Sequence, residues 1–345
     1  MNKTNIIKSR APLRIGLAGG GSDLSPYCDL YGGYVLNATI SRYVDVIIKP
    51  YKKNNVRFVS LDQQIEKILS LNSIISNNGK LDLHIAVYKY FIKKFNNGKP
   101  ISLELISYID APFGSGLGSS STLVVAMVQA FNKLLNLSLD KYQIASIAYQ
   151  IERVDCGLVG GRQDHYSAIF GGFNFMEFNA NEQNVVNQLK INEYCLYELE
   201  TSLILYFTGV SRNSADIIVD QIKSFSSDSQ ESLKAMHAIK KEALTMKECL
   251  LRGDFLSLTK SLRSSWENKK LTAKTVSNAY IDKIYNTTIK AGALAGKVSG
   301  AGGGGFMFFF VPLDKRMNVI RKLNTFGGLV SNCHFTKQGS QAWKL

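Results

Sequence analysis

Short runs of apolar and β-branched residues, separated by glycine or polar turn residues, mark the first hundred positions of the chain. These runs lie at residues 35–40, 44–48, 56–60 and 101–107. Runs of this length between turn residues are typical of β-strands. Two later runs have the same character, at 202–208 and 306–311, so the pattern predicts strands in both halves of the chain.

Helical spacing begins after residue 120, where a first helix is predicted at 122–135. In the next helix the apolar residues fall at i, i+3, i+4 and i+7, which places them on one face: Ile144, Ile147, Ala148 and Ile151. Ser138 precedes this helix and is its predicted N-cap. Further polar helices are predicted at 212–225, 230–252 and 276–294.

Strands mixed with helices in each half indicate an α+β fold with two domains. A chain of 345 residues is also about the length of two domains. The polar stretch 179–192 is the expected junction, which gives one domain at 1–190 and a second at 191–345.

The composition is that of a folded globular chain, with 45% hydrophobic and 20% charged residues, and it excludes general disorder. The longest apolar stretch, 306–313, is far shorter than the ~18 residues of a membrane span, so no membrane partner is expected. The basic residues within positions 1–14 leave no apolar core for an export signal. The five cysteines and four histidines are scattered, which favours reduced thiols in a cytoplasmic protein over a zinc site.

The chain is basic, with 41 Lys and Arg against 27 Asp and Glu and a formal charge of +14. Its basic residues occur as scattered pairs, without the longer runs or the motifs of nucleic-acid binders. We therefore expect a lysine-rich solvated surface and no nucleic-acid partner. The alternative is a small polyanionic substrate, whose approach a positive field accelerates.

The strongest local signal is a glycine- and serine-rich segment at 111–121, Ala-Pro-Phe-Gly-Ser-Gly-Leu-Gly-Ser-Ser-Ser, between a predicted strand and a predicted helix. The first amides of a helix have no partner within it and, with the helix dipole, form an anion site. The segment lacks Gly-Lys-Ser/Thr, so it is not the P-loop of P-loop NTPases. Its third glycine comes one residue early for a dinucleotide fingerprint. The alternative interpretation is a serine-rich capped turn.

Pro-x-x-x-Gly-Leu-Gly-Ser-Ser resembles the central motif of the GHMP kinases, and two further segments, 11–23 and 298–306, resemble the first and third motifs of that family in the expected order. The resemblance implies ATP- and Mg²⁺-dependent phosphoryl transfer to a hydroxyl group. It also implies an N-terminal α/β domain and a C-terminal ferredoxin-like domain. The ATP-binding residues that it implies are Pro112, Gly114, Ser115, Gly116, Leu117, Gly118, Ser119 and Ser120.

The same resemblance implies that Ser120 and Glu152 are ligands of the magnesium ion, an oxygen pair of the kind that Mg²⁺ prefers. From the sequence alone, Glu152 could equally be an exposed carboxylate on a surface helix. Asp164, within Gly-Gly-Arg-Gln-Asp-His, matches a catalytic aspartate, and Arg14 matches a cation near the transferred group. Whether Asp164 acts as a base or as an orienting charge stays open. His165 is interpreted as a neighbour of the aspartate.

The segment Gly20, Gly21, Ser22 and Asp23 takes the place of bulkier residues in galactokinases and resembles a branch that phosphorylates heptose 7-phosphate or fucose. Asp23 is expected to bind sugar hydroxyls. Arg212, with Lys269 or Lys270, is the candidate for holding a sugar phosphate, the alternative being solvated helix residues. Gly302 and Gly303 are expected beside the substrate or ATP, the alternative being a tight turn.

Together these features predict a kinase that phosphorylates the anomeric hydroxyl of a heptose 7-phosphate, with ATP and the sugar phosphate as its small-molecule partners. The alternatives are an L-fucose or other hexose 1-kinase of the same family, a non-catalytic sensor of sugar and ATP, and a nucleic-acid binder. The oligomeric state is left open, with a homodimer among the options.

Overall fold

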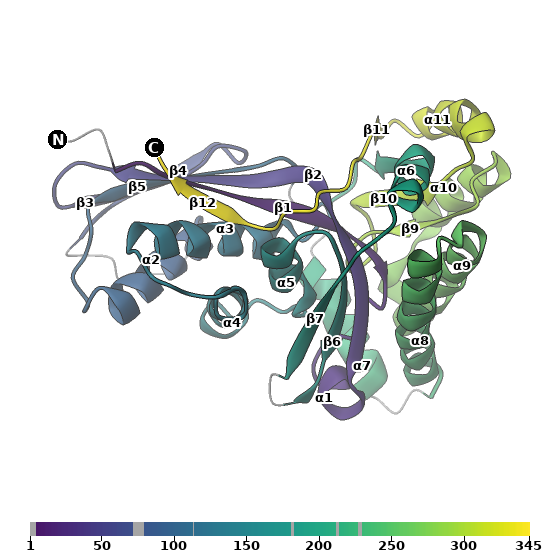
Figure 1. Ribbon diagram of the computed structural model, residues 1–345, viewed down its shortest axis with the longest axis horizontal. Coiled ribbons are helices and arrows are strands. Elements are labelled where there is room, and N and C mark those ends of the chain that lie inside the picture. The colour runs from purple at the N-terminus through teal and green to yellow at the C-terminus, as the bar shows by residue number, and fades with distance from the viewer. Residues whose placement is uncertain (1–4, 72–78, 113, 181–182, 212–213, 227–229) are drawn as a thin grey trace.

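Two β-sheets with helices packed against them make up the protein (Figure 1). The structure is a computed structural model. It describes residues 5–71, 79–112, 114–180, 183–211, 214–226 and 230–345.

The first sheet has eight strands, and six of them follow one another in the order β12-β1-β2-β5-β3-β4. The remaining two, β6 and β7, extend from the first half of β2. The strands of this sheet are β1 (Ile7–Ala18), β2 (Gly33–Pro50), β3 (Asn55–Ser60), β4 (Ile65–Ser70), β5 (Leu103–Ile109), β6 (Phe173–Phe178), β7 (Asn184–Leu189) and β12 (Gln341–Lys344).

Strand β2 is long enough to join the parts of this sheet. Its first half pairs with β6 and its second half with β5, while β1 runs along most of its length. The two short strands predicted at 35–40 and 44–48 are therefore one strand, and that prediction was wrong in this detail. The pairing of this strand with β1 is irregular between Pro12 and Arg14, which lie opposite Tyr43 and Thr39, so the extra residues of the irregularity are in β2. Such bulges re-aim side chains next to binding sites.

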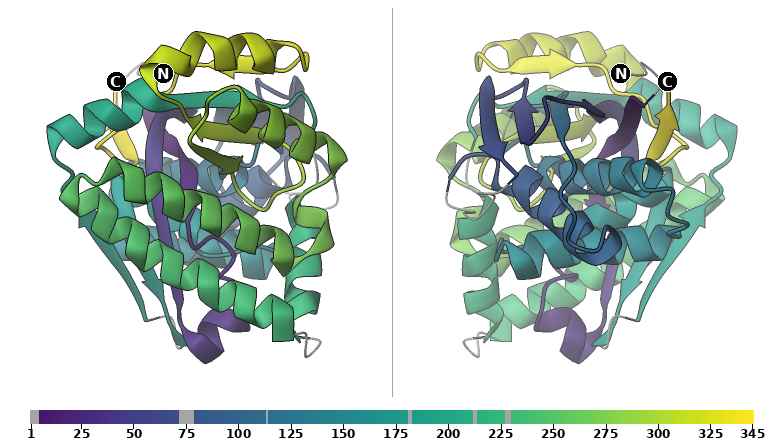
Figure 2. Two further views of the ribbon diagram at one scale, coloured as in Figure 1. Left: turned by 90° about the vertical axis from the view of Figure 1, so that its right-hand side faces the viewer. Right: turned by 90° about the vertical axis from the view of Figure 1, so that its left-hand side faces the viewer.

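Helices of the first half lie on one face of the first sheet, where α3 packs against both β1 and β2, and α8 (Gln230–Arg252) packs against the same two strands from the other side (Figure 2). Ten of the residues of α3 are buried, including Val124, Val125 and Phe131. The helices of this half are α1 (Tyr27–Tyr31), α2 (Asp82–Phe95), α3 (Ser119–Leu134), α4 (Lys141–Tyr149) and α5 (Gln163–Phe170). A π-helical turn, Gln150–Asp155, continues α4 directly.

The second sheet is antiparallel, with the order β11-β8-β10-β9. With helices between β8 and β9 and between β10 and β11, this is the βαββαβ arrangement of a ferredoxin-like domain. Its strands are β8 (Leu203–Phe207), β9 (Ala295–Val298), β10 (Phe306–Phe310) and β11 (Leu329–Ser331). The helices of this half are α6 (Glu193–Ser202), α7 (Ser214–Ser226), α8 (Gln230–Arg252), α9 (Phe255–Thr272), α10 (Ala279–Lys290) and α11 (Arg316–Asn324), with 3₁₀ turns at Lys274–Val276 and Leu313–Lys315.

The chain returns to the first sheet at its end, where β12 pairs with β1 and Trp343 lies opposite Lys8. Both termini consequently lie at the same end of the molecule in Figure 1. A boundary near residue 190 stays a prediction, and the last strand crosses back over it.

The helix predicted around Ile144 begins later than Ser138, which was the wrong N-cap. Asp140 caps it instead, because its side chain accepts from the Gln143 amide at 2.9 Å while Gln143 bonds back to the Asp140 amide. This reciprocal capping box satisfies two amides at once. The predicted helix 276–294 is shorter, since Asn278 caps α10.

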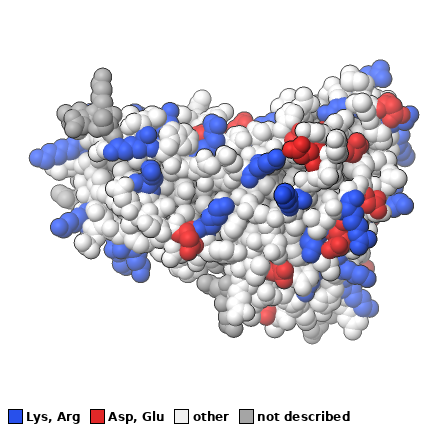
Figure 3. All heavy atoms as spheres, in the orientation of Figure 1, with Lys and Arg blue, Asp and Glu red and all other residues white. Residues whose placement is uncertain are grey.

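None of the helices in the described ranges is long and apolar enough to cross a membrane. On the face drawn in Figure 3, Lys and Arg side chains lie dispersed among uncharged and acidic ones rather than in a continuous stripe. This distribution agrees with the solvated basic surface expected from the sequence.

Candidate active site

The glycine- and serine-rich segment forms a loop between β5 and α3, and one side of it faces a cavity. Gly114, Gly116, Gly118, Ser119 and Ser120 line this cavity. Helix α3 begins at Ser119, and no side chain caps its first amides. Free amides at a helix N-terminus attract anions, so the loop presents to the cavity a surface that suits an anion.

The other side of the loop is anchored to the protein. The Leu117 carbonyl accepts from the Arg14 amide at 3.1 Å, and the Ser115 carbonyl accepts from the Phe306 amide at 2.8 Å. Both side chains, Ser115 and Leu117, are fully buried. Pro112, Ser115 and Leu117 do not line the cavity; Ser115 and Leu117 anchor the loop through their carbonyls, and the assignment of the three residues to ATP stays a prediction.

The glycine-rich segment 298–306, the third motif of the sequence, packs closely against this loop. A Cβ on Gly116 would lie 2.4 Å from the Ser299 carbonyl oxygen, and a Cβ on Gly300 would lie 2.7 Å from the Gly116 carbonyl oxygen. The two backbones can approach this closely only because neither residue has a side chain. The segment thus supports the loop from the second domain, and Gly300 and Ala301 reach the cavity.

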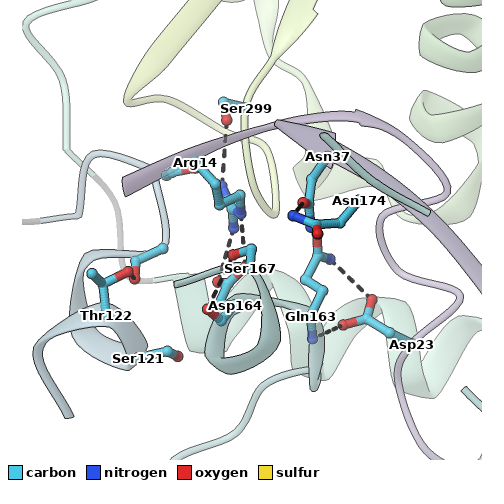
Figure 4. A network of polar contacts seen from close by, with 12 residues as sticks. Arg14, Asp23, Asn37, Ser121, Thr122, Gln163, Asp164, Ser167, Asn174 and Ser299 are labelled. Carbon is cyan, nitrogen blue, oxygen red and sulfur yellow. Dashed lines mark hydrogen bonds and ion pairs between the residues drawn. The ribbon is translucent and has the colours of Figure 1, made fainter. Parts of the chain in front are cut away.

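Arg14 and Asp164 form a two-point ion pair at the cavity (Figure 4). Arg14 Nε donates to Asp164 Oδ1 at 2.7 Å and Nη2 donates to Oδ2 at 2.8 Å. Arg14 Nη1 also donates to the Gly116 carbonyl at 2.7 Å. The Arg14 side chain is 5% exposed and that of Asp164 is 18% exposed, so the pair is largely shielded from water.

Asp164 lies directly against the start of α3. A Cβ on Gly118, whose φ is +76°, would stand 3.0 Å from Asp164 Cγ. Glycine at this position therefore allows both the left-handed backbone conformation and the close approach of the Asp164 carboxylate. The arrangement places a fixed carboxylate next to the phosphate-binding amides, as transfer from a phosphate to a hydroxyl group requires.

Glu152 is completely buried, and the interpretation as an exposed surface carboxylate was wrong. It lies in the π-helical turn, where His165 Nε2 is 2.7 Å and Arg153 Nη2 is 3.4 Å from Glu152 Oε2. Burial alone would raise the pKa of Glu152, but the charge of Arg153 and the hydrogen bond from His165 outweigh it and hold the pKa at about 2. The group is therefore an anion at neutral pH.

The second oxygen of this carboxylate, Oε1, is buried and has no hydrogen-bond partner. Glu152 and Ser120 line the same cavity, and a carboxylate with a hydroxyl is an oxygen set that suits a hard divalent cation. No cluster of three or more His, Cys, Asp or Glu residues forms among the described residues. A cation here would thus take its remaining ligands from phosphate and water, as Mg²⁺ commonly does.

Asp23 and Lys269 occupy another part of the cavity. Asp23 is 2% exposed and accepts from the Gln163 amide and from Gln163 Nε2, both at 3.1 Å. Lys269 Nζ donates to the Gly20 carbonyl at 2.7 Å. Burial lowers the pKa of Lys269 to about 8, opposed by the nearby charge of Asp23. A buried ammonium with one neutral acceptor is suited to binding an anion.

The cavity that collects these groups has a volume of about 360 Å³ and lies where the two halves of the chain meet. Besides the residues already described, it is lined by an apolar group and by residues of α7. These are Leu24, Leu83, Leu158, Val159, Ser214, Ala215, Ile218 and Gln221. Its contents match a phosphoryl-transfer site: helix amides, a metal-type carboxylate, an ion-paired aspartate and a buried cation.

Two family models match the chain. One describes the N-terminal domain of GHMP kinases and matches residues 82–172, and the other describes the GHMP kinase C-terminal domain and matches residues 246–329. The chain is also 46% identical to the D-glycero-alpha-D-manno-heptose 7-phosphate kinase of Campylobacter jejuni, over 98% of its own length and 99% of that protein. The chain belongs to the GHMP kinase family.

Two solved structures resemble this GHMP kinase over nearly the whole chain. One is described as a D-glycero-D-manno-heptose 1-phosphate kinase from Bacteroides thetaiotaomicron, with a TM-score of 0.84, 40% identity and coverage of 98% and 99% of the two chains. The other is a putative sugar kinase from Campylobacter jejuni, with a TM-score of 0.82, 45% identity and full coverage of both. The family resemblance and the two-domain fold expected from the sequence are thereby confirmed, and so is ATP as the phosphoryl donor.

Three residues that were predicted to bind the substrate of this GHMP kinase, Ser22, Gly302 and Gly303, contact the surrounding backbone. The Ser22 hydroxyl lies 2.8 Å from the Gly19 carbonyl and 2.9 Å from the Tyr34 carbonyl, either of which can accept its proton. It therefore connects the glycine turn to β2, and Ser22 does not line the cavity. Gly302 and Gly303 pack on Val276, whose carbonyl accepts from the Gly303 amide at 2.7 Å. Ser22, Gly302 and Gly303 do not line the cavity, whereas Gly20 and Gly21 do, and the assignment of all five residues to the substrate stays a prediction.

Of the two adjacent lysines, only Lys269 reaches the site. Lys270 Nζ pairs with Glu267 at 2.7 Å on the helix surface and is absent from the cavity lining, and its assignment to the sugar phosphate stays a prediction without support from this geometry. Consecutive helix residues point about 100° apart, which explains the separation. Arg212, the third candidate for the sugar phosphate, lies outside the described residues.

The sequence reasoning missed Arg153 and Gln163, which line the cavity of this GHMP kinase, and a nearby buried lysine, Lys297, which does not line it. Arg153 lines the cavity and donates to Ser121 Oγ at 2.9 Å. Gln163 holds Asp23 from the residue next to Asp164. Lys297 is buried behind β1, and burial together with the charges of Lys269 and Arg14 lowers its pKa well below the usual value. Arg153 directly follows Glu152 in the chain, and this position next to a predicted metal ligand was the one sequence signal for its role.

Proposed function

We propose that this GHMP kinase transfers the γ-phosphoryl group of ATP to the anomeric hydroxyl of D-glycero-D-manno-heptose 7-phosphate and forms the 1,7-bisphosphate. The Campylobacter jejuni relative, 46% identical over nearly the full length, carries that substrate in its name. The observation on which the proposal rests is that the Arg14–Asp164 pair and the buried Lys269 line one cavity with the N-terminus of α3.

The donor side of the reaction is assigned to the loop and its neighbours. The amides at the start of α3 bind phosphate oxygens, and Ser120 and Glu152 are proposed to hold Mg²⁺, which would neutralise phosphate charge when bound. Arg153, held by Ser121 and the Leu158 carbonyl, adds positive charge at the same wall of the cavity. These groups bind and orient the triphosphate without covalent participation.

The acceptor hydroxyl is assigned to Asp164. Arg14 fixes both oxygens of this carboxylate, so its remaining lone pairs have a defined direction into the cavity. There Asp164 receives the hydroxyl proton or orients the hydroxyl by its charge, and Arg14 offsets charge on the transferred group.

The sugar is assigned to the Asp23 side of the cavity. Asp23 Oδ1 accepts from both the Gly21 amide and Gln163 Nε2, whereas Oδ2 accepts only from the Gln163 amide among the described residues, so Oδ2 retains a lone pair that can accept from a sugar hydroxyl. Lys269 is the proposed partner of the 7-phosphate, because within the described part of the chain its buried ammonium donates to the neutral Gly20 carbonyl and to no other acceptor. Arg212 is retained as a second proposed partner.

The test is identification of the product by phosphorus NMR after incubation with ATP and a panel of acceptors. The panel holds heptose 7-phosphate, heptose 1-phosphate, unphosphorylated heptose and L-fucose, and Asp164→Asn serves as the inactive control. A new anomeric phosphate on heptose 7-phosphate is expected. Turnover of only heptose 1-phosphate or only L-fucose would overturn the choice of acceptor. Nucleotide binding without turnover of any sugar would favour a non-catalytic sensor.

We also propose that the protein is cytoplasmic and that it is a monomer or a homodimer. The five cysteines are all unpaired thiols in the structure, which suits a reducing compartment. Fractionation of cells and size-exclusion chromatography with light scattering measure the two properties directly.

A further inference from the structure

Two neighbouring residues in the first turn of α5 serve the two carboxylates of the site: Asp164 is one of these carboxylates, and His165 binds the other, Glu152. Asp164 points to Arg14 at the cavity, while the next residue, His165, points to Glu152. The distance from His165 Nε2 to Glu152 Oε2 is 2.7 Å, and both side chains are completely buried. Because His165 Nε2 binds Oε2, the free oxygen Oε1 of Glu152 has a fixed direction, and it is the atom that lacks a partner.

We propose that His165 is a positioning residue that sets the Glu152 carboxylate for the divalent cation bound with ATP. The inference rests on the proposed function, since it takes Glu152 as a metal ligand. Carboxylates that ligate metals are themselves oriented by hydrogen bonds from residues behind them, and removing such partners typically weakens metal affinity.

The backbone around Glu152 supports this role independently. Residues 150–155 form a π-helical turn in which the Cys156 amide bonds to the Ile151 carbonyl at 3.0 Å, one residue further than in an α-helix. Single π-turns within α-helices are frequent at functional sites. Here the turn directs Glu152 inward to His165 and lets the following Arg153 reach Ser121 at the cavity wall.

A purely structural role for His165 predicts a different outcome. The ring also packs edge-on against Tyr149, with centroids 5.6 Å apart, so its removal would lower stability whether or not a cation binds nearby. Metal affinity measured on folded protein separates the two roles, because packing loss alone leaves the affinity of the folded fraction unchanged.

The experiment compares His165→Gln with His165→Met, two unbranched side chains of similar size of which only Gln retains an N–H donor. His84 provides the matched control. It is also a buried histidine, 2% exposed with one hydrogen bond of 2.8 Å to Ser107, and it does not line the cavity. Mn²⁺ binding to the enzyme with a non-hydrolysable ATP analogue is measured by electron paramagnetic resonance, and nucleotide binding in EDTA by calorimetry.

His165→Met is expected to weaken Mn²⁺ binding by ~10–100-fold, His165→Gln to stay within about 3-fold of the wild type, and His84→Met to leave Mn²⁺ binding unchanged. Nucleotide binding in EDTA is expected to be the same in all of them. Folded His165→Met with wild-type Mn²⁺ affinity would overturn the proposal. Should His165→Met not fold, His165→Leu, which also lacks an N–H donor, takes its place with the same expected loss, and folded His165→Leu with wild-type Mn²⁺ affinity would overturn the proposal. No sugar is present in these measurements, so their outcome is independent of the acceptor assigned above.

Discussion

The guanidinium of Arg14 on β1 binds both carboxylate oxygens of Asp164 on α5, at 2.7 and 2.8 Å, although 150 residues separate the two in the chain. On the same strand Arg10 pairs with Asp45 in a similar way, at 2.8 and 3.2 Å. The Arg10 side chain is 51% exposed and that of Arg14 only 5%. Exposed pairs contribute little, whereas a shielded pair beside a helix N-terminus can act on a substrate.

Asp164→Asn is expected to lower kcat by ~10²–10⁴, because an amide neither accepts the hydroxyl proton nor carries the orienting charge. Nucleotide binding should survive, since the loop amides are unchanged. Steady-state kinetics and calorimetric titration with an ATP analogue measure the two effects. Asp45→Asn, which alters the exposed pair, should leave kcat unchanged. Near-normal turnover in Asp164→Asn would remove this residue from the mechanism.

Lys269→Met is expected to raise KM for heptose 7-phosphate by ~10–100-fold, the scale of a lost hydrogen bond to a charged group. The effect on unphosphorylated heptose should be much smaller, because that sugar lacks the phosphate. Lys270→Met is the matched control, since Lys270 pairs with Glu267 outside the cavity. An unchanged ratio of kcat/KM for the two sugars would reject Lys269 as the phosphate partner.

The pH profile gives a separate test of Lys269. Its pKa in the folded protein is lowered to about 8, mainly by burial, so the ammonium loses its proton as the pH rises above 8. The value of kcat/KM for heptose 7-phosphate, which reports groups of the free enzyme, should therefore fall above pH 8. Lys269→Arg keeps its charge across this range and should lack the fall. The same decline in both enzymes would assign it to another group.

Gly118→Ala is expected to lower kcat by several-fold, since the new Cβ would push the Asp164 carboxylate away by a few tenths of an ångström and a displacement of about 1 Å can have effects up to ~100-fold. The new Cβ would lie 3.0 Å from Asp164 Cγ at a φ of +76°. Gly98→Ala shares the conformation, with φ +70°, but meets open space. Both variants should lose about 1 kcal/mol of stability, and only Gly118→Ala should lose activity. Equal kcat in both would show that the contact with Asp164 is not critical.

Local patterns predicted the element types around the site well. The strand, the glycine-rich loop and the helix of 103–134 all formed as expected, because glycine spacing and apolar periodicity act within a few residues. The same reasoning did not predict the π-turn at Gln150–Asp155 or the cap at Asp140 in place of Ser138. These depend on which of several competing hydrogen bonds the packed structure favours.

Sequence by itself determined the family of this chain and the chemical groups available to it: a helix N-terminus flanked by glycine, a carboxylate at 164 and a cation at 14. Only the tertiary structure decided which of these groups meet. It buried Glu152 against His165, sent Lys269 to the cavity and Lys270 to the surface, and used Ser22 to hold the backbone. The reason is that such contacts join residues far apart in the chain, whose approach depends on how both sheets pack and not on any local pattern.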